Sequence, residues 1–349
     1  VAERNPHTDS NFGRAAIRYQ TFWPKRRGGG RLWYHAGDES NSTEDTRMMM
    51  VLLGPLLTLP MGAAEPPFPL VQAIPMPGRQ AAFEIEGREA ARYHYDASYH
   101  RPFVFPLIGP AGRPVTRLTH PHDPDGHGHH LSVWVAHRSV NGANFWENGD
   151  ARIVHQAIEQ YKDGATAASL TVRNAWTDGA GAALLDERRT IALHALPDDE
   201  RYLDVAIELA PAGAPVTFGA TPFGFLAVRV AKTMSVADGG GTIRNSEGGV
   251  DEEGVFWKRA RWVDYTGRVT PDERNGVTFF DHPSNPRYPA FYHVRNDGWM
   301  GASFTKDEPF ILAQGETLTL RYRLFVHGAD AAPERIEQHW QRWADSGAD

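Results

Sequence analysis

Six histidines lie within eighteen residues, in the segment "HPHDPDGHGHHLSVWVAH" that begins at residue 120. Imidazole titrates near neutral pH and also binds divalent metals, so this cluster suits proton transfer, metal binding or hydrogen bonding to a polar ligand. Alternate side chains of an extended chain face the same way, which predicts His127, His129 and His137 on one face and His130 on the other. The turn signal "DPDG" just before them places the cluster at the mouth of a strand, where pockets form.

The cluster leaves two site chemistries open. In the first, His127 and His129 form an H-x-H pair that reaches one divalent metal ion, and His137 supplies a third ligand. In the second, the imidazoles act without a metal, as proton-transfer or substrate-binding groups. The alternative to both is that these histidines only form hydrogen bonds at the rim of the fold and take no part in binding or catalysis. This alternative stays open because the H-x-H spacing is by itself a weak signal.

Three later segments combine carboxylates, cations and aromatic rings. They are "NSEGG" (245–249), "KRARWVDY" (258–265) and "FDHPSNPRYPAFYHVRNDGW" (280–299). The last holds its polar side chains around three prolines, and polar side chains on such stiff loops often serve binding or catalysis. Arginine and histidine bind hydroxyl or carboxylate groups, tryptophan offers a flat apolar face, and glutamate or aspartate transfers protons. Together these residue types point to a carbohydrate ligand.

Strands are expected to position these residues, because apolar and polar residues alternate from Ala81 onwards. Seven segments between turn signals are rich in Val, Ile, Phe, Tyr or Thr and are predicted to be strands. They span residues 101–109, 130–137, 169–176, 189–196, 202–209, 276–282 and 318–327. In the last, Leu318 and Leu320 alternate with Arg321 and Arg323, which is typical of an antiparallel sheet with one wet face.

One segment predicts a helix. In "APERIEQHWQRWAD", Ile336, Trp340 and Trp343 recur at helical spacing after Pro333, which predicts a helix over residues 333–345. The expected fold class is all-β, a large antiparallel β-sandwich with a short C-terminal helix. The sequence has no G-x-G-x-x-G after a strand and no P-loop motif, so we expect no nucleotide cofactor.

The composition excludes several classes of protein. The chain has 349 residues, 41% of them hydrophobic and 23% charged, with a formal net charge of −7 and no cysteine. It therefore has no disulfide, no thiolate metal site and no cysteine nucleophile. It also has no basic stripe or arginine-rich run, so we expect no nucleic-acid partner.

The N-terminal residues differ from the rest. Residues 1–47 show no sustained period and are expected to be an upstream extension or disordered. Residues 48–64, "MMMVLLGPLLTLPMGAA", are apolar, uncharged and end in small residues, which predicts a secretory signal peptide. A single β-sandwich domain over residues 65–349 would then be periplasmic or secreted, with no membrane span in the mature protein. The alternative is a genuine N-terminal tail followed by a buried apolar segment.

Several segments, in the same order, resemble a bacterial family labelled "methane oxygenase PmoA-like", over about residues 101–328. They are "GHGHHLSVWVAHRSVNGANFW", "RIVHQ", "NSEGG", "WKRARWVDYTG", "FDHPSNPRYPAFYHVR" and "GETLTLRYRLFVH". The first motif of that family usually reads D-H-P-H-H-R-G-L-W-F, and His127, His129, His130 and Trp134 match it here. Glycine at positions 126 and 128 and leucine at 131 replace its acidic residue, proline and arginine. An activity that needs that acidic residue or arginine is therefore in doubt for this chain.

The methane label conflicts with the sequence. The methane monooxygenase subunit of that name spans the membrane several times, and apart from the predicted signal peptide no segment here is long and apolar enough to do so. The stretch "YLDVAIELAPAGAPVTFGATPFGFLAVRV" instead resembles the galactose-mutarotase type of β-supersandwich. That fold is common among secreted carbohydrate epimerases, lyases and hydrolases. This resemblance concerns the fold, and a fold does not determine a function.

The family resemblance carries over a set of candidate residues, which also includes His155 and His282. His129 and His293 are the predicted catalytic histidines, with Glu247 and Asp264 as their carboxylate partners. The predicted substrate-binding residues are His130, Trp134, Asn141, Lys258, Arg261, Asn285, Arg287 and Arg295. The cations among them would stabilise developing negative charge.

Three functions remain open. The first is a secreted or periplasmic enzyme that uses His and Asp/Glu acid–base chemistry on a sugar or sugar derivative, as a lyase, epimerase or hydrolase. The second is a metal-dependent oxygenase or hydrolase with His127, His129 and His137 as ligands. The third is a non-catalytic protein that binds glycans through the same groups. A small molecule or an oligosaccharide is the expected partner.

Overall fold

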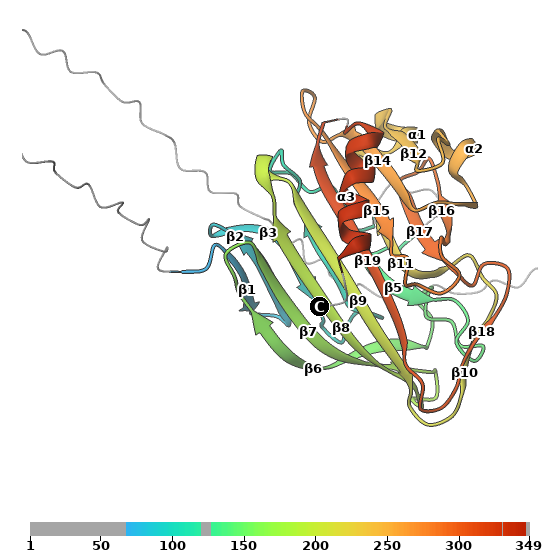
Figure 1. Cartoon of the computed structure of the whole chain (residues 1–349). Helices are drawn as coiled ribbons and strands as arrows, with labels where there is room; N and C mark the ends of the chain where they lie inside the picture. The colour runs from blue at the N-terminus through green and yellow to red at the C-terminus, as the bar shows by residue number, and fades with distance from the viewer. Residues whose placement is uncertain (1–67, 120–126, 330, 347–349) are drawn as a thin grey trace, which may run out of the picture. The chain divides into compact units, whose positions relative to one another are not determined.

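Two large antiparallel sheets form a sandwich (Figure 1). The computed structural model describes residues 68–119, 127–329 and 331–346. The segment 1–47 and the predicted signal peptide over residues 48–64 lie outside the described residues. The all-β fold class is confirmed, and so is the short helix at its C-terminal end.

The first sheet has nine strands. In order across the sheet they are β1 (Val71–Met76), β2 (Gln80–Ile85), β3 (Arg88–His94), β4 (Phe103–Leu107), β5 (Val133–His137), β11 (Gly224–Arg229), β17 (Trp299–Ser303), β16 (Phe291–Val294) and β13 (Lys258–Arg259).

The second sheet has eight strands, and a separate pair lies outside both sheets. In order the eight are β12 (Thr242–Asn245), β14 (Trp262–Arg268), β15 (Arg274–Asp281), β19 (Leu318–Gly328), β9 (Arg201–Pro211), β8 (Ala183–Ala195), β7 (Ala167–Thr177) and β6 (Arg152–Lys162). The pair is β10 (Val216–Phe218) and β18 (Phe310–Leu312).

Alternation along the strands fixes which face of each sheet is buried. In β19, Leu318, Leu320 and Tyr322 are buried, whereas Arg321 and Arg323 are only partly buried on the opposite face. Each of the seven predicted strand segments overlaps one observed strand. In chain order these strands are β4, β5, β7, β8, β9, β15 and β19. The match holds because side chains of successive residues point to opposite faces of a sheet.

The main core lies between the two sheets. Phe83 and Val135 from the nine-stranded sheet and Ile207 and Leu320 from the eight-stranded sheet belong to this one cluster. Burying a side chain of this size contributes about 1.5–3 kcal/mol of folding free energy. The core therefore holds the strands that carry the polar residues described below.

Helices are short in this fold, except at the C-terminal end. They are η1 (Pro197–Asp199), η2 (Lys232–Met234), α1 (Val236–Gly239), α2 (Asp251–Val255) and α3 (Pro333–Asp345). Helix α3 packs Ile336, Trp340 and Trp343 against Phe280 and Phe325, on the outer face of the eight-stranded sheet (Figure 1). None of the helices in the described part of the chain is long and apolar enough to cross a membrane.

Candidate functional site

A cavity of about 500 Å³ brings together histidines that are far apart in the sequence. It is lined by His127, His129, His130, Arg138, Trp146, Glu147, Phe223, Ala237, Glu252, His293, Arg295, Asn296, Asp297 and Trp299. Strands β16 and β17, helices α1 and α2, and the segments that flank β5 and precede β11 supply these residues. We call it the histidine cavity. Both predicted catalytic histidines, His129 and His293, line it.

An aromatic layer, separate from the main core, supports the histidine cavity. Trp134, Trp146 and Trp299 pack together with Phe103 in this layer. Trp134 is fully buried, and its indole nitrogen has no hydrogen-bond partner among the described residues. The predicted substrate-binding residue Trp134 therefore lies beneath the cavity rather than on its wall.

The three histidines before β5 lie in a turn rather than a strand. The His130 backbone N–H donates to the His127 carbonyl oxygen at 3.1 Å, and β5 begins only at Val133. The His127 and His130 rings consequently stack, 4.7 Å apart, and the His129 ring lies 4.3 Å from that of His130. The expectation that His130 faces away from its neighbours is wrong, because it assumed an extended chain.

The predicted metal ligands do not converge. The rings of the predicted pair His127 and His129 lie 5.9 Å apart, nearly perpendicular at 79°. His137 lies apart: its Nδ1 accepts from the Ser139 N–H at 3.1 Å and its Nε2 lies 2.9 Å from the Thr305 hydroxyl. Over the described ranges, no group of three His, Asp or Glu side chains is placed to hold a metal ion. The donor set does not fit the divalent ion that the sequence suggested.

His293 is a buried imidazole on the wall of the cavity. The residue is only 7% exposed, and neither ring nitrogen has a hydrogen-bond partner in the described part of the chain. Its ring lies 4.1 Å from that of Trp299 and 4.9 Å from that of Phe256. Burial, reinforced by Arg295, lowers the pKa of His293 to about 3. The ring is therefore neutral at neutral pH and can both accept and donate a hydrogen bond.

Two other histidines of the cavity are also neutral at neutral pH. Burial lowers the pKa of His129 to about 4, with a smaller contribution from Arg101. Burial and the neighbouring His129 and Arg229 lower the pKa of His130 far below its usual value. Arg229 Nη1 donates to His130 Nδ1 at 3.0 Å, so the His130 proton resides on Nε2.

The carboxylates of the cavity are not the predicted ones. Glu252 on α2 accepts from the Asn296 N–H at 2.6 Å and pairs with Arg295 Nε at 3.0 Å. Asp297 Oδ2 pairs with Arg229 at 3.3 Å, and Asp297 Oδ1 has no hydrogen-bond partner among the described residues. Neither carboxylate was predicted from the sequence, although Asp297 lies in the segment 280–299, which ends in "NDGW". Nothing in the sequence marked Glu252 as a site residue except the acidic run "DEEG" in which it lies.

Glu247 and Asp264 lie outside the histidine cavity. Glu247 is in an exposed turn, 3.4 Å from Arg261 Nη1. Arg261 pairs in turn with Glu337 of helix α3 at 3.2 Å. Asp264 is fully buried in β14, where His327 Nε2 lies 3.0 Å from its Oδ1. Both predicted carboxylate partners therefore contact structural neighbours instead of the catalytic histidines.

The other predicted substrate-binding residues are also engaged elsewhere. Asn141 accepts from the Thr217 N–H at 2.8 Å, and Asn285 donates to Asp281 at 2.7 Å. Arg287 donates to the carbonyl oxygens of residues 304, 308 and 309 at 2.7–3.2 Å and so clamps a loop. Lys258 is exposed on β13 and does not line the cavity. Of the predicted substrate-binding set, His130 and Arg295 line the cavity directly.

Comparisons with known proteins give a family but no activity. A family model matches residues 80–341, which is most of the chain. The chain belongs to the family of unknown function DUF6807. The DUF6807 match contains every residue that lines the histidine cavity. No curated protein matches the chain.

Solved structures similar to this DUF6807 chain include two carbohydrate-active proteins. A heparan sulfate lyase from Pedobacter heparinus is 8% identical over 72% of this chain, with a TM-score of 0.32. The chain spans 31% of that lyase. A GalM/aldose epimerase homologue from C. elegans is 8% identical over 74% of this chain and 99% of its own length, with a TM-score of 0.28. Likeness at this level carries no argument about activity.

Proposed function

We propose that the histidine cavity is the active site of an enzyme that performs acid–base chemistry on a sugar or sugar derivative. The observation that carries the proposal is the state of His293. It is a neutral, buried imidazole whose two nitrogens have no partner among the described residues, on the wall of a cavity of about 500 Å³. A buried polar group without a partner is costly to a fold, so such a group is commonly kept for a ligand.

The rest of the cavity suits the same chemistry. His293 accepts a proton from a substrate hydroxyl or from an acidic C–H, and the free Oδ1 of Asp297 offers a second polar contact. Arg138 and Arg295 line the cavity, paired with Glu147 and Glu252, and can donate to hydroxyl or carboxylate groups. The partly exposed Phe223 offers an apolar ring face to a sugar. The segments that resemble PmoA-like proteins contain His129, His130 and His293, and all three line the proposed active site. We propose no metal-dependent step.

A comparison of variants tests the proposal. Glycosides and uronic acids are screened for turnover by NMR with the purified chain, its His293→Ala variant and a His100→Ala control. His100 is a partly buried histidine that does not line the cavity. We expect turnover in the wild type and the control and its loss in His293→Ala, with the same unfolding midpoint in all three. Binding without turnover in the wild type would indicate a glycan-binding protein instead, and turnover by His293→Ala would refute the assignment.

We also propose that the protein is exported to the periplasm or beyond, on the strength of the apolar segment 48–64. Expression of the full sequence followed by N-terminal sequencing of the exported form tests this. A mature start near Glu65 is expected. A protein that keeps residues 48–64 and stays inside the cell would overturn the proposal.

A further inference from the structure

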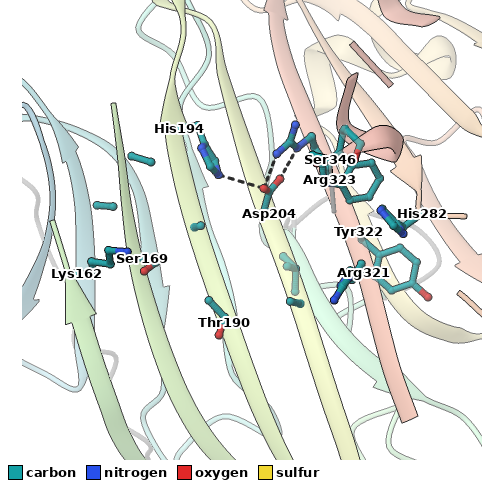
Figure 2. Close-up of a pocket in the computed structure, with 16 residues that line it drawn as sticks. Lys162, Ser169, Thr190, His194, Asp204, His282, Arg321, Tyr322, Arg323 and Ser346 are labelled. Carbon is teal, nitrogen blue, oxygen red and sulfur yellow. Dashed lines mark hydrogen bonds and ion pairs between the residues drawn. The ribbon is translucent and has the colours of Figure 1, made fainter. Parts of the chain in front are cut away.

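A second cavity, of about 440 Å³, lies on the outer face of the eight-stranded sheet, beside the end of helix α3 (Figure 2). Strand pairing explains its floor. Ser169 pairs with Ala192 and Ala192 with Asp204, while Thr190 pairs with Ala206 in the next row. These outward-facing side chains are small, so the middle of the sheet is hollowed between the longer side chains at either side. We call this hollow the outer-face cavity.

A cation lies at the β19 end of each row, and a third cation lies at the β6 end of the first row. Asp204 pairs with Arg323 and Ala206 with Arg321 on β19, while Lys162 pairs with Ser169 on β6. Four strand spacings separate β6 from β19, which is about 19 Å at about 4.8 Å each. Arg321 and Arg323 are two residues apart on one strand and so face the same way. They form a pair of guanidinium groups at one end of the hollow.

Among the described residues, one carboxylate lines the outer-face cavity, and it is already neutralised. Arg323 donates to both oxygens of Asp204 at 2.6 Å, and His194 Nε2 lies 3.1 Å from Asp204 Oδ2 (Figure 2). Burial opposes ionisation of Asp204, but the hydrogen bonds from Arg323 and His194 outweigh it and lower its pKa. Among the described residues, Arg321 and Lys162 have no side-chain partner, so the cavity keeps an excess of positive charge.

The donors at the arginine end are held in place. The Arg323 guanidinium lies over the Tyr202 ring at 4.1 Å, and its bidentate pair with Asp204 leaves Nη1 free for a ligand. His282 is 7% exposed, and its Nδ1 accepts from the Ser284 N–H at 3.1 Å. Neutral His282 therefore carries its proton on Nε2 and is a donor at that atom. Arg321, Arg323 and His282 together offer donors without a free acceptor, which selects for an anion.

We propose that the outer-face cavity binds an acidic saccharide, with its carboxylate at Arg321 and Arg323 and its ring over the floor of small side chains. The hydroxyls of Ser169 and Thr190 face the same hollow and suit a ligand rich in hydroxyl groups. Trp343 of α3 closes one side of it. This site lies on the other sheet from the histidine cavity and shares no lining residue with it.

Calorimetric titration with galacturonate, and with galactose as its neutral counterpart, tests the proposal. The protein carries His293→Ala, so that binding in the histidine cavity is weakened. We expect binding of galacturonate, none of galactose, and affinity at least about tenfold lower for Arg321→Gln, because a charge-assisted hydrogen bond is lost. The matched control is Arg173→Gln, since Arg173 is an exposed arginine of the same sheet that pairs with Glu159 and does not line this cavity.

Three results would overturn the proposal: no binding of galacturonate, equal weakening by Arg173→Gln and Arg321→Gln, or acetate bound as tightly as galacturonate. The last would show that the site takes any carboxylate. Turnover is measured in parallel with Arg321→Gln in the otherwise unchanged chain. Normal turnover in that variant with weaker galacturonate binding keeps both proposals. Absence of turnover in every form, with galacturonate still bound, refutes the proposed function alone.

Discussion

Arg101 holds the turn that carries His129. Its Nη1 donates to the His129 carbonyl oxygen at 2.8 Å, and its Nη2 donates to the Glu147 carbonyl oxygen at 3.0 Å and to Asn148 Oδ1 at 3.1 Å. Arg101 is 1% exposed, and burial lowers its pKa to about 10. The guanidinium thus ties two walls of the histidine cavity together from beneath.

Arg101→Met should lower kcat more than it raises KM, because it displaces His129 without removing a group that contacts substrate. Loss of these hydrogen bonds to a buried cation should also lower the free energy of unfolding by about 2–4 kcal/mol. Arg101→Lys keeps the charge but not the planar fork, so we expect partial rescue of both quantities. Steady-state kinetics and urea unfolding measure them. Unchanged kcat in a destabilised Arg101→Met would show that Arg101 serves stability alone.

The pH dependence of turnover should distinguish His129 and His293 from exposed histidines, whose pKa is about 6.5. A general base works in its neutral form, which is lost as the pH falls through its pKa. The pKa values of about 3 for His293 and about 4 for His129 place that loss below pH 5. A kcat/KM profile from pH 3.5 to 8 should therefore stay high at pH 5. A decline centred near 6.5 would mean that the catalytic histidine is exposed to water, contrary to its burial.

Metal analysis should not distinguish the wild type from the variant without the H-x-H pair. Both ring nitrogens of His137 contact Ser139 and Thr305, and no three His, Asp or Glu side chains converge among the described residues. Elemental analysis of the purified chain and of His127→Ala/His129→Ala should give the same metal content, and a chelator should leave turnover unchanged. Near-stoichiometric metal that the double variant loses would restore the metal hypothesis.

Glu252, and not Glu247, should matter for turnover. Glu252 lines the cavity and pairs with Arg295, two residues after His293 in the sequence. Glu252→Gln should lower kcat/KM by about a hundredfold, because it removes a group that takes part in proton transfer. The control is Glu247→Gln, which removes an exposed carboxylate outside the cavity and should change the free energy of unfolding by less than about 0.5 kcal/mol. The reverse ranking of the two variants would return Glu247 to the site.

The positions of the strands could be predicted from the sequence more accurately than the residues of the site. Alternation in β9 and β19 is strict because one face packs into the core, and their predicted bounds lie within two residues of those observed. Strand β6 was missed because it lies at the edge of its sheet and few of its residues are buried. Periodicity detects a strand with one buried face, so β11 and β17, in which every residue is buried, were not predicted either.

Within the site, residue type located the histidines but not their partners. Alternation predicts the face on which a side chain lies but not its distance from other side chains, so it could not place Glu252 and Asp297 in the same cavity as His293. It also failed at His130, where a turn replaces the expected strand. Asp264 was a candidate because its segment combines a carboxylate with cations and aromatic rings, but its partner His327 lies 63 residues further along the chain.

The Asp264–His327 pair should control stability rather than turnover. Arg244 Nε also pairs with Asp264 at 3.0 Å, and the Thr278 hydroxyl donates to it at 2.9 Å. Burial opposes the charge on both members of the pair, but their mutual attraction outweighs it, raising the pKa of His327 and lowering that of Asp264. The His327 contribution is fully present below its unfolded pKa of about 6.5 and is lost as the pH rises through its higher folded pKa. The Asp264 contribution is present above about 3.9 and is lost as the pH falls through its lower folded pKa.

The free energy of unfolding should therefore be largest between about pH 4 and 6.5, as far as this pair contributes. Asp264→Asn leaves His327 buried without its counter-charge and should cost about 3–5 kcal/mol near pH 5, and less at pH 8.5, where His327 is neutral more often. Urea unfolding at the two pH values measures this difference. Turnover per folded molecule should stay unchanged, because Asp264 lies outside the histidine cavity. If Asp264→Asn instead abolished turnover at unchanged stability, Asp264 would be the carboxylate that the sequence first suggested.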